Sequence, residues 1–206
     1  MSVAPLPTVC VVDDDDSVRS GVQRLLASSG LRVECFASAR ELLDGNHHLR
    51  ADCLVLDLCM PDLDGLGLQE ALRRVGHPGP IVFLTAHGDV PSSVTAMKRG
   101  AIDYLEKPVD ADNLLAAVGS ALRWEAERKE RAEEARAAQG KLATLTPRER
   151  EVLGEVLRGL LNKQVAGRLG ISEKTVKVHR GRVMEKLGAG SVLDLARVVR
   201  VAGLET

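Results

Sequence analysis

The chain has 206 residues, of which 45% are hydrophobic but only 2% aromatic, so its core must be built from aliphatic side chains. This length suits one large domain or two small ones. No apolar run approaches the roughly 18–20 residues needed to cross a bilayer, which argues against a membrane protein. The segment from Met1 to Thr8 also lacks the basic stretch and apolar region of a signal peptide. We therefore expect a cytoplasmic protein with no membrane partner.

The formal net charge of −1 conceals an asymmetry along the chain. Residues 1–122 carry 10 Lys and Arg against 17 Asp and Glu, a balance of −7. Residues 123–140 carry 5 of each kind, and residues 141–206 carry 13 basic against 7 acidic residues, a balance of +6. An acidic first part and a basic last part suggest separate tasks, and a basic domain of this size suits a polyanion.

The four cysteines lie in the first third of the chain and form no CxxC pair. Their spacing matches neither a disulfide framework nor a zinc site. A free thiol within an apolar run behaves as a small hydrophobic side chain. We therefore expect reduced, structural thiols at Cys10, Cys35, Cys53 and Cys59.

Short apolar runs alternate with amphipathic segments over the first 110 residues. Apolar runs of about 4–8 residues predict buried strands, and apolar residues that recur every three or four positions predict helices. This alternation is typical of an α/β fold with a doubly wound, five-stranded parallel sheet. The expected strands cover residues 9–12, 31–36, 53–56, 81–84 and 101–105, and the expected helices begin near residues 18, 39, 66, 92 and 111.

From Arg123 to Gln139 the composition shifts to Arg, Lys, Glu and Ala without a sustained apolar seam. This predicts a solvated helix that continues the last helix of the first domain. Half of a weak coiled coil is the alternative, but Ala is the main apolar residue, so a linker is favoured.

A new apolar periodicity begins after Gly140. Thr146 can cap a helix that has Pro147 at its first position and Glu149 at its third, the arrangement of a capping box. Three more helices are expected near residues 162–169, 172–187 and 191–202. We therefore expect an α/β domain at 1–122, a helical linker at 123–141 and an all-α helix-turn-helix domain at 142–206.

Polar residues follow four of the expected strands at the point where each strand ends. Asp13 and Asp14 follow the first strand, Asp57 the third, Thr85 the fourth and Lys107 the fifth. Parallel sheets bind ligands at the carboxyl ends of their strands. Converging carboxylates repel one another unless a cation or a lysine neutralises them, and an all-oxygen set of ligands suits Mg²⁺. An aspartate can also act as a nucleophile and form an acyl phosphate.

Four short motifs coincide with these strand ends: VDD at 12–14, LDLCMPDLDG at 56–65, TA at 85–86 and KP at 107–108. Together they resemble the receiver domain of two-component response regulators, and the string TAHGDVP at 85–91 resembles its FixJ/StyR branch. The resemblance implies that a sensor histidine kinase phosphorylates Asp57. Mg²⁺ would bind Asp14, Asp57 and the main-chain carbonyl of Cys59, with Asp13 supporting it through water. Cys59 stands where an arginine or another polar residue is expected, a change that a carbonyl ligand tolerates.

The same resemblance implies a switch. Thr85 would hydrogen-bond the phosphoryl group and Lys107 would pair with it, since neutralising charge is most of what such transfers require. Thr85 would then move toward the phosphoryl group and Tyr104 would turn inward, reshaping the face made by residues 92–99 and 101–105. The alternative for Tyr104 is a surface aromatic with its hydroxyl in water. The Lys107–Pro108 bond is expected to be cis.

The expected helix at 172–187 has two distinct faces at 100° per residue. The core face carries Val176, Val183, Met184 and Leu187, and the opposite face carries Lys174, Val178, Gly181 and Glu185, with Lys177 beside it. A glycine within a helix costs about 1 kcal/mol, so a plain solvated face does not explain it. Both Val178 and Gly181 suit a face that enters a major groove, where Val contacts a thymine methyl and Gly permits close approach. A protein-binding three-helix bundle is the alternative.

Three strings closely resemble the LuxR/NarL-type DNA-binding domain: LTPREREVL at 145–153, NKQVA at 162–166 and SEKTVKVHR at 172–180. The resemblance implies that residues 172–187 form the recognition helix, with Lys177 and Val178 facing the bases, and that residues 191–202 pair two domains. Gly181 stands where a larger residue is expected. The candidate DNA contacts are Lys163, Lys174, Thr175, Lys177, Val178, Arg180, Gly181, Arg182 and Lys186.

These features predict a response regulator that is phosphorylated on Asp57, forms a homodimer, binds double-stranded promoter DNA and activates transcription together with RNA polymerase. It would not be an enzyme beyond the Mg²⁺-dependent phosphorylation and dephosphorylation of its own Asp57. One rival is a phosphatase of the haloacid dehalogenase type, which expects a second aspartate where Cys59 stands. The others are a pseudo-receiver and an adaptor whose basic domain never binds DNA.

Overall fold

The computed structural model describes residues 6–77, 79–86 and 90–204, apart from the side chains of residues 90–92. The chain folds into two compact units, Met1–Glu127 and Arg128–Thr206. No helix in the described part of the chain is long and apolar enough to span a bilayer.

One sheet forms the centre of the first unit, with every pair of neighbouring strands parallel and the order β2-β1-β3-β4-β5. The strands are β1 (Thr8–Val12), β2 (Arg32–Phe36), β3 (Cys53–Asp57), β4 (Ile81–Thr85) and β5 (Asp103–Glu106). Every residue of β1, β3 and β4 is buried, because these strands lie inside the sheet and helices cover both faces. The predicted doubly wound parallel sheet is confirmed.

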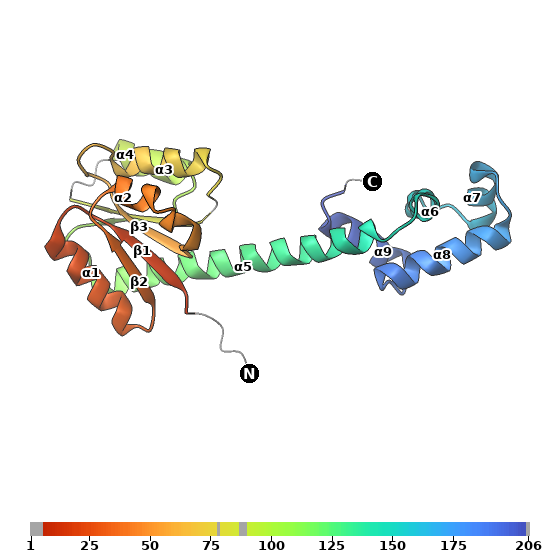
Figure 1. Cartoon of the computed structure of the whole chain (residues 1–206), viewed down its shortest axis with the longest axis horizontal. Helices are drawn as coiled ribbons and strands as arrows, with labels where there is room; N and C mark the ends of the chain where they lie inside the picture. Colours follow the sequence, from red (N-terminus) through yellow and green to blue (C-terminus); the bar gives the residue numbers. More distant parts are fainter. Residues whose placement is uncertain (1–5, 78, 87–89, 205–206) are drawn as a thin grey trace. The chain divides into compact units, whose positions relative to one another are not determined.

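Helices cover both faces of this sheet. They are α1 (Asp16–Ser28), α2 (Ala39–Asp44), α3 (Gly65–Arg74), α4 (Val90–Lys98) and the start of α5 (Ala111–Ala143), with a 3₁₀ helix η1 at His47–Arg50 that the sequence patterns did not predict. Figure 1 shows α1 and α5 on one face and α2, α3 and α4 on the other. Successive residues of a strand point to opposite faces. Val9 and Val11 therefore pack in the layer with α1 and α5, whereas Cys10 and Val12 pack in the layer with α2 and α3.

All four cysteines are free thiols. Cys10 and Cys53 are buried in β1 and β3, Cys35 is half-buried and Cys59 is exposed. Burial raises the pKa of Cys10 to about 12, so its thiol stays protonated at neutral pH. The prediction of free structural thiols therefore holds for the two buried cysteines.

The second unit is a bundle of short helices around its own aliphatic core. They are α6 (Pro147–Leu157), α7 (Asn162–Leu169), α8 (Glu173–Leu187) and α9 (Val192–Val201). The end of α5 belongs to this core, since Ala138 and Leu142 are buried in it and Gln139 Nε2 donates to Ala202 O at 3.1 Å. The linker is therefore helical as predicted, but it is not solvated over its whole length, because Glu125 near its start and Ala138 near its end are buried.

Glu149 fastens α6 to α8. It forms the predicted capping box with Thr146, and it is only 2% exposed. Its Oε2 accepts a hydrogen bond from Lys186 Nζ at 2.6 Å, and this bond, followed by the Thr146 amide, lowers the pKa of Glu149 to about 2. The same carboxylate therefore accepts a hydrogen bond from the N-cap amide of α6 and neutralises a lysine of α8.

We predict that Glu149→Gln lowers the melting temperature of the second unit at pH 7, because the capping bonds survive but the charge facing Lys186 is lost. Since the folded-state pKa of Glu149 lies below its ordinary value of 4.5, its stabilisation is full above pH 4.5 and is lost as the pH falls toward 2. The expected decrease is about 4–8 °C for each kcal/mol of stability lost at pH 7, and it shrinks in acid. Calorimetry of the full chain measures it, with the exposed Glu151→Gln as the matched control. A variant that melts like the wild type at pH 7 would contradict the assignment.

Candidate functional site

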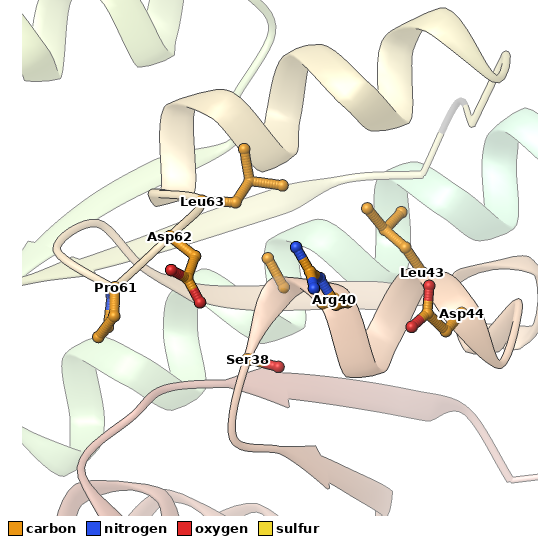
Figure 2. A pocket seen from close by; sticks show the side chains of 8 residues that line it. Ser38, Arg40, Leu43, Asp44, Pro61, Asp62 and Leu63 are labelled. Carbon is orange, nitrogen blue, oxygen red and sulfur yellow. The ribbon is translucent and has the colours of Figure 1, made fainter.

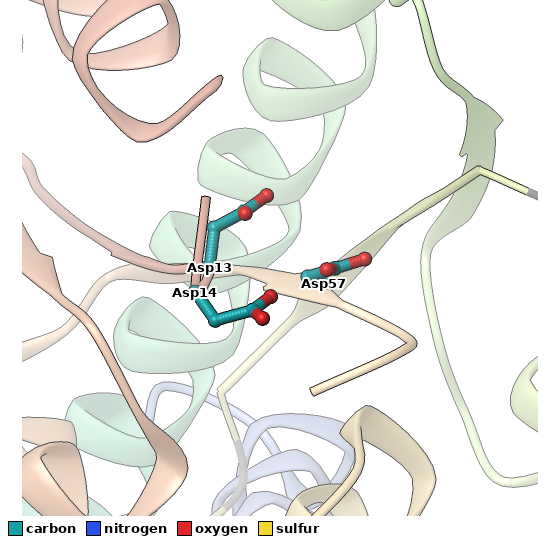
Figure 3. A group of neighbouring side chains, drawn as sticks. All are labelled: Asp13, Asp14 and Asp57. Atoms are coloured by element: carbon teal, nitrogen blue, oxygen red, sulfur yellow. The ribbon is translucent and has the colours of Figure 1, made fainter. Parts of the chain in front are cut away.

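Three carboxylates converge at the carboxyl edge of the sheet. Asp13 and Asp14 directly follow β1, and Asp57 is the last residue of β3, the strand beside it. One oxygen from each carboxylate lies within 4.8 Å of the other two (Figure 3). Asp13 and Asp57 are buried, whereas Asp14 is exposed. The cluster therefore has a buried floor and an open entrance.

Lys107 brings a positive charge to the floor of this cluster. Its Nζ lies 2.7 Å from Asp13 Oδ2 and 3.1 Å from Asp57 Oδ2. Its main-chain N–H donates to Thr85 O at 2.6 Å, which ties the residue after β5 to the end of β4. The Lys107–Pro108 bond is cis, as expected.

Burial and charge oppose each other in this site. Loss of solvent raises the pKa of Asp57, the hydrogen bond and charge of Lys107 act in the opposite direction, and the neighbouring Asp13 charge adds to the rise. Burial lowers the pKa of Lys107, but the hydrogen bonds and charges of Asp13 and then Asp57 outweigh it, so the net shift is upward. Lys107 is therefore protonated and balances one of three carboxylates. An excess of two negative charges remains when all three are ionised.

The donors at this site fit a divalent cation. They are all oxygens, three carboxylates face one lysine, and Asp14 is exposed to solvent. Mg²⁺ prefers such oxygen ligands and retains several waters. Cys59 lies in the same loop, where its main-chain N–H donates to Asp57 Oδ1 at 3.4 Å and its side chain is exposed.

Gly65 lets α3 begin close to the end of β3 and the loop that follows it. A Cβ on this residue would lie 2.5 Å from the main-chain oxygen of Asp57 and 3.0 Å from Leu58 Cα. Its N–H donates to Leu58 O at 2.9 Å. Only glycine permits this approach. Gly65 is the last residue of the motif at 56–65, but the sequence pattern does not show why a glycine is needed there.

The two proposed switch residues lie on neighbouring strands. Thr85 ends β4 and is completely buried. Tyr104 of β5 is half-buried, its ring centroid lies 6.5 Å from that of Phe83, and its hydroxyl oxygen is buried without a hydrogen-bond partner among the described residues. The alternative of a surface tyrosine with a hydrated hydroxyl does not describe this conformation. Residues 87–89 of the FixJ/StyR-like string lie outside the described residues.

A separate hollow of about 470 Å³ lies between α2 and the loop that follows β3 (Figure 2). Its lining residues are Ser38, Ala39, Arg40, Leu43, Asp44, Pro61, Asp62 and Leu63. It contains none of the three clustered aspartates, and sequence reasoning did not single out its residues. The hollow is therefore separate from the acidic cluster, which is the candidate functional site.

Helices α7 and α8 form a helix-turn-helix in the second unit. Gly170, at φ 65°, ends α7 in a left-handed conformation that suits glycine, and Ser172 caps α8 by accepting a hydrogen bond from Thr175 N at 3.1 Å. Val176 and Val183 of α8 are buried as predicted, while Val178 is 48% exposed. An apolar residue is thus exposed on the outer face of α8.

Seven of the nine candidate DNA contacts are exposed: Lys163, Lys174, Lys177, Val178, Gly181, Arg182 and Lys186. Three of the nine, Thr175, Arg180 and Lys186, have partners within the fold. Arg180 Nη1 donates to Asn162 Oδ1 at 3.0 Å, the Thr175 hydroxyl lies 2.8 Å from Ser172 Oγ, and Lys186 Nζ binds Glu149 and the Thr144 carbonyl. Lys186 therefore has a structural partner that its sequence position did not reveal.

Comparison with known proteins agrees with this division. Residues 9–119 match the family of response regulator receiver domains, and residues 143–199 match bacterial regulatory proteins of the luxR family. The chain is 44% identical over 190 residues to the response regulator protein TmoT of Ectopseudomonas mendocina, covering 92% of this chain and 86% of that protein. It is 45% identical over 197 residues to the transcriptional regulatory protein FixJ of Azorhizobium caulinodans, covering 95% and 93%.

Solved structures give the same result. The response regulator StyR is 46% identical, with a TM-score of 0.83 and coverage of 95% of this chain and 99% of that one. Full-length FixJ from B. japonicum is 38% identical, with a TM-score of 0.60 and coverage of 97% and 98%. The chain therefore belongs to the response regulators, as a transcriptional regulator with a receiver domain and a LuxR-type DNA-binding domain.

Proposed function

We propose that this response regulator accepts a phosphoryl group on Asp57 from a sensor histidine kinase, forms a homodimer and binds promoter DNA to activate transcription. It would act in the cytoplasm, where a kinase, DNA and RNA polymerase are all within reach. The observation that carries the proposal is the buried Asp57 carboxylate, paired with Lys107 and facing Asp13 and Asp14.

Each residue of the cluster has a distinct role in this proposal. Asp57 attacks the phosphorus of a phosphohistidine, an acyl phosphate bond forms, and the P–N bond to the histidine breaks. Lys107 stabilises the negative charge of the transferring group, and Thr85 hydrogen-bonds it. Asp14, Asp57 and the Cys59 carbonyl would hold Mg²⁺, with Asp13 supporting it through water. The bound cation would neutralise further charge on the phosphoryl oxygens.

The switch we propose uses the strand ends beside the cluster. Thr85 moves toward the phosphoryl group, and Tyr104 takes the inward position. In this structure the Tyr104 ring already packs near Phe83 with a buried hydroxyl, which supports the existence of that inward position. The face changed by the movement consists of α4 and β5, and we propose it as the dimer contact.

For the second unit we propose that α8 enters the major groove. Lys177, Val178 and Gly181 would face the bases, while Lys163, Lys174 and Arg182 would contact phosphates. We propose supporting contacts for Thr175 and Arg180, and a structural role for Lys186, whose ammonium is held by buried Glu149. We propose that α9 pairs two such domains, so that the half-sites lie about one helical turn apart. We propose that the receiver domain spans residues 1–122, the linker residues 123–141 and the DNA-binding domain residues 142–206.

The first test is sizing by light scattering with and without acetyl phosphate and Mg²⁺. We expect the wild type to change from monomer to dimer mass only when both are present, and Asp57→Asn to remain monomeric. DNA affinity for a duplex enriched from a random pool should rise in the same samples. Unchanged mass and unchanged DNA affinity in the wild type would reject the switch. Absence of any salt-sensitive duplex binding would favour the adaptor.

A second prediction concerns the stability of the receiver without metal. Because burial raises the pKa of Asp57 above its ordinary value of 3.8, ionisation of Asp57 destabilises the folded state as the pH rises through that value. In EDTA at pH 7, Asp57→Asn should therefore melt several degrees above the wild type, on a scale of about 4 °C per kcal/mol, and the difference should shrink toward pH 4. Mg²⁺ should raise the melting temperature of the wild type more than that of the variant. Exposed Asp44→Asn is the control, and a variant that melts below the wild type contradicts the argument.

A third prediction separates fold from recognition at Gly181. A Cβ on this residue would have no atom within 4 Å, so the fold does not require glycine here. Gly181→Ala should stabilise the second unit by about 1 kcal/mol but weaken binding to the enriched duplex, measured by fluorescence anisotropy. Gly154→Ala on α6 has equal space and should give the same stabilisation with unchanged DNA affinity. Equal affinities for both variants would remove Gly181 from the proposed interface.

A further inference from the structure

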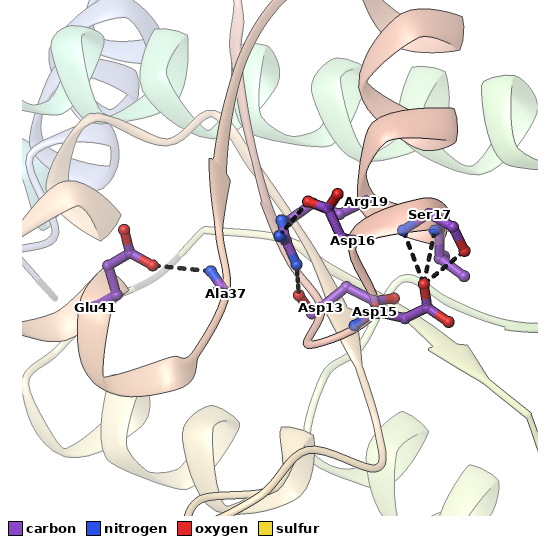
Figure 4. A network of polar contacts seen from close by, with 8 residues as sticks. Asp13, Asp15, Asp16, Ser17, Arg19, Ala37 and Glu41 are labelled. Carbon is purple, nitrogen blue, oxygen red and sulfur yellow. Dashed lines mark hydrogen bonds and ion pairs between the residues drawn. The ribbon is translucent and has the colours of Figure 1, made fainter.

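The loop between β1 and α1 carries two of the three clustered carboxylates, and Arg19 of α1 reaches back to it. Arg19 Nη1 donates to the main-chain oxygen of Asp13 at 2.6 Å, and Nη2 donates to Asp16 Oδ1 at 2.7 Å (Figure 4). The Arg19 side chain is only 16% exposed, whereas that of Asp16 is 87% exposed. The guanidinium therefore has one buried acceptor on the loop and one acceptor in solvent.

The carbonyl that Arg19 binds belongs to the peptide group joining Asp13 to Asp14. A peptide group is planar, so the orientation of this carbonyl sets the direction in which the chain continues into Asp14. The Asp14 carboxylate lies within 4.8 Å of Asp57, yet no hydrogen bond or ion pair from the described residues holds it there. Its position thus depends on the backbone beneath it.

The other contacts of this loop hold different atoms. Asp13 N donates to Phe36 O at 3.2 Å, and Asp13 Oδ1 accepts a hydrogen bond from Asp15 N at 2.9 Å. Asp15 caps α1 through the amides of Ser17 and Val18. These contacts fix the Asp13 side chain and the start of the helix. Arg19 is the residue that holds the Asp13 carbonyl.

We infer that Arg19 is a positioning residue for the divalent cation: by holding the Asp13–Asp14 peptide group, it aims the Asp14 carboxylate at Asp57. The inference rests on the proposed function and deepens it. Arg19 touches neither the phosphoryl group nor the cation, and its own positive charge opposes cation binding. A positioning effect and a charge effect therefore have opposite signs, which makes them separable.

The test is calorimetric titration of the full chain with MgCl₂, comparing the wild type with Arg19→Met and Arg19→Lys. We expect Arg19→Met to raise the Mg²⁺ dissociation constant about tenfold or more, as the loss of a residue that orients a metal ligand typically does. Arg19→Lys should lie between it and the wild type, because an ammonium can reach only one of the two acceptors well. The Mg²⁺ concentration giving half-maximal modification by acetyl phosphate should rise in parallel, with little change in the rate at saturating Mg²⁺.

Two controls share one property each with Arg19→Met. Arg24→Met removes the same charge from an exposed position on α1, and Asp16→Ala removes only the outer acceptor. Both should bind Mg²⁺ within twofold of the wild type.

An unchanged or lower dissociation constant for a folded Arg19→Met would overturn the inference. If its melting curve shows that Arg19→Met does not stay folded, Arg19→Lys decides, and a value equal to that of the wild type overturns it. A wild type that binds no Mg²⁺ would instead reject the proposed function.

Discussion

The receiver site depends on three carboxylates that repel one another but are held close together by the fold. The ends of β1 and β3 bring Asp13, Asp14 and Asp57 within 4.8 Å of one another, and among the described residues Lys107 is the cation that pairs with this cluster. Like charges in a poorly solvated site repel one another strongly, so these carboxylates would move apart if the fold did not hold them in place. The aliphatic layers on both faces of the sheet hold it together. Apolar packing therefore maintains an electrostatic arrangement that favours a divalent cation.

Much of the fold and the acidic cluster was predictable from sequence, because their causes are local. Central strands such as 9–12 and 81–84 are continuous apolar runs between turns, and polar residues placed at the ends of parallel strands must meet at one edge. The capping box at Thr146 was equally readable, since its residues are three positions apart. Local sequence patterns therefore predict these features without any information on the packing.

The contacts that sequence patterns did not reveal are those between residues far apart in the chain. Lys186 looks like any basic residue of a DNA-binding helix, but its partner Glu149 lies 37 positions away and is buried. The end of the linker has the same Ala-rich composition as its solvated middle, and only the second core shows that Ala138 is buried. Arg19 was one arginine among many charges until its contact with the Asp13 carbonyl was seen. Charge and composition alone do not reveal such pairings.

The caps of α1 and α3 bear on which anions the receiver admits. The start of a helix attracts phosphate because its free amide groups point outward. Here Asp15 takes the amides of Ser17 and Val18, and Asp64 takes the amide of Gly67, so these donors are already bonded to carboxylates of the chain itself. Inorganic phosphate in solution therefore meets added negative charge at both helix starts. The amides of Ser17, Val18 and Gly67 are thus already bonded, and each cap places a carboxylate where an anion would otherwise bind.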